Sequence, residues 1–127
     1  MPKLLPERGA FYCVLFGLAF LLVAVDAVDF SGSYSDPNHS NCLRTVQVVG
    51  TRADVSGTDG SPGCPPDGTG EAWDLVGEVH GETIQVDFSP KGGPANLTGK
   101  YETSPSPGIR WPDGNLWSKK NAMEDVE

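Results

Sequence analysis

The residues that could carry out catalysis are few, and the closest pair is an acid and a histidine. Asp36 and His39 stand three residues apart in the stretch SDPNHS. A carboxylate and an imidazole at this spacing can orient each other, act as an acid–base pair or bind a metal ion weakly. With Asp87 they define one hypothesis, a small hydrolase or isomerase. No Gly-x-Ser-x-Gly nucleophile motif accompanies them, and His80, the other histidine, is predicted to be an exposed turn residue.

The remaining polar motifs are predicted to be turns. Asp-Gly steps occur at Asp59, Asp67 and Asp113, and Asp-Gly is first a turn signal because glycine accepts a positive φ. None of the three fits an EF-hand loop, although the loop that carries Asp59, Asp67 and Glu71 stays open as a calcium candidate. Ser89 to Pro94 is predicted to be a hairpin loop, with Lys91 paired to Asp87 on the surface. The sequence thus predicts neither a metal site nor a cofactor.

The large aromatic side chains favour binding over catalysis. Sugar rings and apolar ligands stack on such side chains, and small pockets are lined by them. In a small domain, however, most large aromatics belong to the core. The residues predicted to contact a ligand are Trp111, Trp73 and Tyr34, with Asp113 beside them.

The N-terminus resembles a secretory leader. Lys3 and Arg8 precede an apolar run from Ala10 to Val25, and Val25-Asp26-Ala27 follows as a cleavage-site pattern. These features predict a signal peptide over residues 1–27, cleaved after Ala27, and a secreted protein. The alternative is a membrane-tethered protein with an uncleaved anchor, but the apolar run is shorter than the roughly 20 residues that a span needs.

The charge of the chain limits its partners. The formal net charge is −8, and it is unchanged without residues 1–27, because these hold two basic and two acidic side chains. An acidic protein repels nucleic acid and anionic lipid. We therefore expect an extracellular partner, either a small ligand or a protein or glycan, and no membrane contact after cleavage.

Cysteines and sequons fit the same compartment. Cys13 lies in the leader, which leaves Cys42 and Cys64 as an even pair that is predicted to form a disulfide in an oxidising environment. Asn38-His39-Ser40 and Asn96-Leu97-Thr98 are N-x-S/T triplets. We therefore expect Asn38 and Asn96 to lie on the surface as candidate glycosylation sites.

The rest of the chain predicts an all-β fold. Short alternating segments recur about every ten residues, separated by Gly and Pro. They cover 28–34, 42–49, 51–56, 71–79, 83–88 and 95–102, with two more in the stretch GIRWPDGNLWSKK at 108–120. Closure of an antiparallel sheet into a barrel removes its exposed strand edges. We therefore predict a closed up-and-down barrel of about eight strands over residues 28–120, a Gly/Pro-rich loop over 57–70 and a disordered acidic tail over 121–127.

The last two segments predict a hairpin whose inner face is aromatic. Pro-Asp-Gly is typical of a type I turn with Gly114 in the left-handed region. This turn pairs Trp111 with Asn115 and Ile109 with Trp117, and places Ile109, Trp111 and Trp117 on one face. Trp111, nearest the rim, is the strongest candidate for ligand contact.

Two resemblances accompany these patterns. VDFSPKGGPANLTG and GIRWPDGNLW resemble the signature of a group of small β-proteins from algae and other microbes, which implies no particular activity. Gly32-Ser33-Tyr34 resembles the Gly-x-aromatic opening of the calycin barrels (lipocalins and avidins), with Tyr34 where those proteins usually have Trp. This resemblance implies a meander barrel and carries over no ligand-binding residue.

The leading hypothesis is therefore a small, secreted, disulfide-stapled barrel that binds a small apolar or sugar ligand at its mouth and is not an enzyme. An extracellular hydrolase or isomerase and a purely structural surface protein stay open as alternatives.

Overall fold

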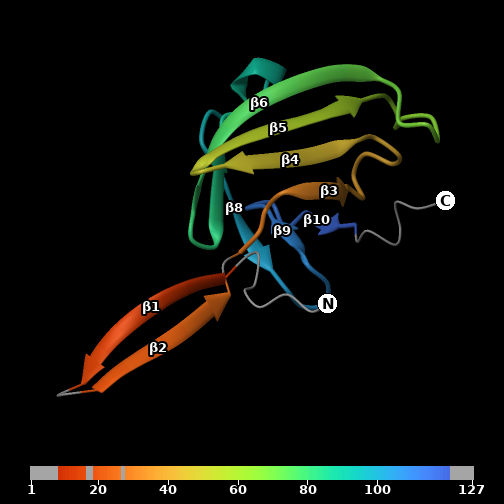
Figure 1. Ribbon diagram of the computed structural model, residues 1–127. Coiled ribbons are helices and arrows are strands. Elements are labelled where there is room, and N and C mark those ends of the chain that lie inside the picture. Colours follow the sequence, from red (N-terminus) through yellow and green to blue (C-terminus); the bar gives the residue numbers. More distant parts are fainter. Residues whose placement is uncertain (1–8, 17–18, 27, 121–127) are drawn as a thin grey trace.

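The fold is a closed barrel preceded by a separate pair of strands (Figure 1). The computed structural model describes residues 9–16, 19–26 and 28–120. The N-terminal strands are β1 (Gly9–Phe16) and β2 (Ala19–Asp26). The barrel strands are β3 (Gly32–Ser35), β4 (Arg44–Val49), β5 (Arg52–Asp59), β6 (Glu71–His80), β7 (Thr83–Val86), β8 (Leu97–Glu102), β9 (Gly108–Arg110) and β10 (Leu116–Lys119). One 3₁₀ turn, η1 (Ser89–Lys91), lies between β7 and β8.

The barrel is an antiparallel meander in which each strand pairs with the next, and β10 closes it against β3. Figure 1 shows β4, β5 and β6 side by side on one wall. The prediction of an all-β, up-and-down barrel of eight strands is confirmed. Closure leaves no free sheet edge in the barrel.

The predicted leader is only partly described. Residues 1–8, 17–18 and 27, with the expected cleavage position at Ala27, lie outside the described residues. The segments between them form β1 and β2, paired from Gly9↔Asp26 to Phe16↔Ala19. Signal-peptide cleavage stays a prediction. The predicted acidic tail, 121–127, also lies outside the described residues. Within the described ranges, no segment forms a helix with the length and apolarity of a membrane span.

Side chains fill the centre of the barrel. Alternation along the strands sends every second residue inward, and the buried cluster consists of Phe30, Tyr34, Val46, Ala53, Val55, Leu75, Ile84, Val86, Ile109, Trp111 and Trp117. The predicted closing hairpin is confirmed. Ile109 pairs with Trp117, the Trp111 N–H donates to the Asn115 carbonyl at 2.9 Å, and Gly114 has φ +92°.

The predicted loop after β5 starts later than expected. Gly57, Thr58 and Asp59 continue β5 and pair with Trp73, Ala72 and Glu71 at the start of β6. Gly57 was interpreted as the first residue of the loop, but it lies within the strand. A β-carbon there would lie 2.2 Å from the Leu43 carbonyl and 2.6 Å from the Trp73 ring, so glycine permits a close strand approach.

A substitution at Gly99 tests how tightly the core is packed. A β-carbon at Gly99 would lie 2.6 Å from Ile109 Cγ2 and 3.0 Å from the Trp111 ring. Gly99→Ala is expected to lower the free energy of unfolding by about 1–3 kcal/mol through overpacking. Lys100→Ala, on the exposed face of β8, is the control. Urea denaturation measures both, and equal midpoints for the two variants would show that the core near Trp111 has spare room.

Candidate functional site

One end of the barrel, which we call the mouth, carries the candidate site. It is the end where β3, β5, β7 and β9 finish and β4, β6, β8 and β10 begin. A pocket of about 130 Å³ opens there. Its lining combines five apolar or aromatic side chains with six polar ones: Trp73, Phe88, Leu97, Trp111, Trp117, Asp36, His39, Arg44, Lys91, Asp113 and Asn115.

The pocket unites three of the four residues predicted to contact a ligand. Trp73 comes from β6, while Trp111 and Asp113 come from the β9–β10 turn, and all three line the pocket. Tyr34 does not line this pocket. It is 1% exposed, and its hydroxyl donates to the Phe30 carbonyl at 2.6 Å. Burial, with smaller contributions from Tyr101 and Asp29, raises the pKa of Tyr34 far above its usual value.

The aromatic wall of the pocket is rigidly packed. The Trp111 ring meets Trp117 edge to face at 5.0 Å between centroids and meets Phe88 at 5.5 Å. The buried indole N–H of Trp111 has no hydrogen-bond partner within the described chain. An unpaired buried donor is costly to the fold.

Asp36 is a structural carboxylate on the floor of the pocket. Its Oδ1 accepts from the Asn38 N–H and from Asn115 Nδ2, both at 2.9 Å. Its Oδ2 accepts from Arg44 Nε at 3.2 Å and from His39 Nδ1 at 3.1 Å. Burial acts to raise the pKa of Asp36, but these hydrogen bonds and the Arg44 charge outweigh it and lower the pKa. Because four donors surround it, Asp36 is poorly suited to take a proton from a substrate.

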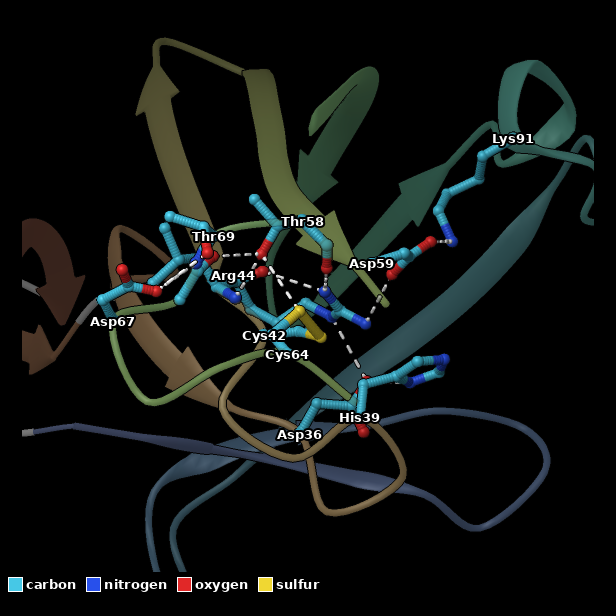
Figure 2. Close-up of a disulfide and its surroundings, with 12 residues drawn as sticks. Asp36, His39, Cys42, Arg44, Thr58, Asp59, Cys64, Asp67, Thr69 and Lys91 are labelled. Atoms are coloured by element: carbon cyan, nitrogen blue, oxygen red, sulfur yellow. Dashed lines mark hydrogen bonds and ion pairs between the residues drawn. A yellow bond between two sulfur atoms is a disulfide. The ribbon is translucent and has the colours of Figure 1, made fainter. Parts of the chain in front are cut away.

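Arg44 is the centre of the charge network (Figure 2). It is 2% exposed and donates to the Thr58 carbonyl at 2.7 Å, the Leu43 carbonyl at 2.8 Å, and the carboxylates of Asp36 and Asp59, each at 3.2 Å. Its guanidinium also lies 5.1 Å from the centre of the Trp73 ring and 5.5 Å from that of Trp117. Arg44 therefore connects the start of β4 to β5, β6, β10 and the loop that follows β3.

Sequence reasoning missed Arg44, although a signal was present. In CLRTVQVV, alternation places Cys42, Arg44 and Val46 on the same, inward face, and the burial of β4 follows that pattern. A charged residue at an inward position needs charged partners. That rule would have predicted buried acids near Arg44, but it could not have named them.

Lys91 closes one side of the pocket. Its ammonium lies 2.7 Å from Asp59 Oδ2 and 5.0 Å from the centre of the Trp73 ring. The predicted Lys91–Asp87 pair is wrong, since Asp87 instead accepts from the Ser89 N–H and hydroxyl. Burial acts to raise the pKa of Asp59, but Lys91, the Trp73 indole and Arg44 lower it overall. The Trp73 indole N–H is buried and has no hydrogen-bond partner within the described residues.

The disulfide holds the loops beside the mouth. The predicted bond between Cys42 and Cys64 is present, and the Cys64 N–H donates to the Ser40 carbonyl at 2.8 Å. The Thr58 hydroxyl adds a second tie, because it donates to the Gly68 carbonyl and accepts from the Leu43 N–H. The disulfide fits an oxidising compartment. Asn38 and Asn96 are both exposed, as expected, and their glycosylation stays a prediction.

The other candidate sites are dispersed. Asp36 and His39 are in contact, but Asp87 does not line the pocket. His80 is exposed, as predicted, and pairs with Glu78. In the calcium candidate, Asp59 pairs with Lys91, while Asp67 accepts from Thr69. No three side chains of His, Cys, Asp or Glu gather as metal ligands within the described residues.

Comparison of the chain with protein-family models, curated proteins and solved structures found no match.

The low pKa of Asp36 makes stability pH-dependent. A carboxyl whose pKa is lower in the folded than in the unfolded state stabilises the fold above the unfolded pKa, about 4, and this contribution is lost as pH falls further. At pH 7, Asp36→Asn is expected to be less stable than the wild type by about 2 kcal/mol. The difference should shrink between about pH 5 and pH 2. Thermal melts across that range measure it, and a constant difference would contradict the role given to Asp36.

Proposed function

We propose that this protein is a small, secreted, non-enzymatic binding module whose barrel mouth takes the apolar or sugar head group of a ligand. The observation that carries the proposal is the pocket itself, which Trp73 of β6 lines together with Trp111 and Asp113 of the β9–β10 turn. Apolar walls with a few convergent polar groups are typical of small-molecule sites.

The size of the pocket defines how much of a ligand enters. Pockets for drug-sized ligands measure about 300–1,000 Å³, whereas the mouth holds about 130 Å³. One ring or compact head group can enter, and the rest of the ligand must stay outside. The filled core below the mouth leaves the rim as the place of contact.

The pocket also provides polar contacts for the edge of a ring. Asn115, His39 and Asp113 line it beside the aromatic wall. Sugar rings combine an apolar face with polar edges, which matches this arrangement.

The enzyme alternative has one observation in its favour, the contact of His39 with Asp36 at 3.1 Å. When Nδ1 donates to Asp36, Nε2 is left as an acceptor that can serve as a base. An activity that depends on this pair should be lost in His39→Ala. Saturable ring binding by the wild type without turnover supports the binding module instead.

Tryptophan fluorescence tests the proposal directly, because all three tryptophans of the chain line the pocket. The wild type is titrated with methyl β-D-glucopyranoside and with cyclohexanol. At least one of these ring probes is expected to give a saturable change, and Trp111→Phe is expected to weaken binding about threefold to tenfold. Tyr101→Phe, an aromatic change on the distant end of β8, is the matched control.

Two results would contradict the proposal. One is the absence of a saturable response to both probes. The other is an equal loss of affinity in Trp111→Phe and Tyr101→Phe, which would show that the ligand does not bind specifically at the mouth.

A further inference from the structure

The strongest unexplained contact at the mouth is that of Lys91 with Trp73 and Asp59. A primary ammonium lies over the face of an indole at 5.0 Å, with a carboxylate oxygen at 2.7 Å. An aromatic face and a carboxylate are the two groups that recognise organic cations. The protein thus already holds one such cation, and that cation belongs to its own chain.

We propose that Trp73 and Asp59 form a subsite for a ligand that carries a primary ammonium group, and that Lys91 occupies it as a tethered competitor. The proposal rests on the proposed function, because it refines the chemistry of the ligand at the same mouth. It also makes Lys91 a determinant of affinity, since a ligand must displace its ammonium to enter.

The attachment of Lys91 allows such a displacement. Its backbone belongs to η1, a turn without buried residues that is followed by Gly92 with φ +92°. Its side chain is 23% exposed, and an ammonium on a flexible four-carbon stem can leave its partner without movement of the backbone. Asp59, by contrast, is fixed from the other side by Arg44 at 3.2 Å. The cation is therefore the exchangeable partner and the anion is the fixed one.

The surroundings suit a cation with a ring or chain attached. The subsite adjoins the aromatic wall of Trp111, Trp117 and Phe88, which can cover the apolar part of the ligand. The chain has a net charge of −8, which attracts cations over longer distances.

Three four-carbon probes of different charge test the proposal: n-butylammonium, n-butanol and n-butyrate, at equal ionic strength. They are titrated into the wild type, Lys91→Ala, Lys91→Ala with Asp59→Asn, and Lys100→Ala. The last variant removes an exposed lysine from β8. Binding is followed by tryptophan fluorescence, and circular dichroism checks that each variant is folded.

Lys91→Ala is expected to bind n-butylammonium about tenfold more tightly than the wild type, because the competing ion pair and cation–π contact are gone. The added Asp59→Asn change should abolish that gain, and Lys100→Ala should match the wild type. In Lys91→Ala, n-butylammonium should also raise the melting temperature, whereas n-butanol should not.

Equal binding of n-butanol and n-butylammonium to Lys91→Ala would overturn the ammonium subsite but leave the binding pocket intact. Preferential binding of n-butyrate to the wild type, lost in Lys91→Ala, would overturn it as well, because Lys91 would then recognise an anion. Binding of n-butylammonium to Lys91→Ala without any response to the ring probes would support the subsite and contradict the proposed function.

Discussion

Arg44→Met is expected to destabilise the protein by about 3–5 kcal/mol, since removing one partner of a buried ion pair leaves uncompensated charge. Asp36 and Asp59 would lose their shared cation, and the Thr58 and Leu43 carbonyls would lose a donor. Methionine fills a similar volume, so the loss measures the network rather than a cavity. Urea denaturation followed by circular dichroism provides the measurement.

The control for Arg44→Met is Arg52→Met. Arg52 pairs with Asp54 at 3.0 Å, but its side chain is 63% exposed, and an exposed pair contributes at most about 1 kcal/mol. A loss of stability in Arg44→Met no larger than that in Arg52→Met would mean that the network does not organise the mouth. The fluorescence response to the ring probes is a second readout. Under conditions in which Arg44→Met is folded, its response should be weaker than that of the wild type.

Loss of the disulfide is expected to have the next largest effect. The bond joins residues 22 positions apart, and a loop of that size corresponds to about 3 kcal/mol in the chain-entropy description. The variant Cys42→Ala with Cys64→Ala should therefore unfold at a lower urea concentration. The bond also fixes Cys64, whose N–H donates to the Ser40 carbonyl, so amide exchange in the loop 60–70 should accelerate more than exchange in β6.

Reduction of the wild type provides the matched control. Dithiothreitol should lower the urea midpoint of the wild type to that of the double variant and leave the double variant unchanged. Equal midpoints for the oxidised and reduced wild type would show that the bond contributes nothing to stability.

The strand pattern was the most predictable feature of this protein. Alternation in β6 and β7 depends on local sequence alone, and the inward positions of Leu75, Ile84 and Val86 follow from it. The closing hairpin was equally predictable, because Pro-Asp-Gly sets the turn and the turn sets the register of Ile109 with Trp117.

The site was less predictable because it depends on how distant strands meet. Lys91 and Asp59 form an ion pair across the mouth, and the sequence offered Asp87 as a nearer partner. Asn115 reaches Asp36 from 79 residues away, since β10 closes the barrel against β3. Tyr34 was assigned to the ligand site from its residue type, but its inward position in β3 places it in the core.

The central claim is that the mouth binds a ligand, and the indole N–H signals of the three tryptophans test it most directly. The ¹H–¹⁵N spectrum is recorded during titration with methyl β-D-glucopyranoside, cyclohexanol and n-butylammonium. We expect the Trp73 and Trp111 indole signals to shift in a saturable way with at least one probe. The backbone amide signal of Gly81, at the opposite end of the barrel, should not shift. Indole signals that remain fixed with all three probes, or shifts confined to the end that carries Gly81, would contradict the claim.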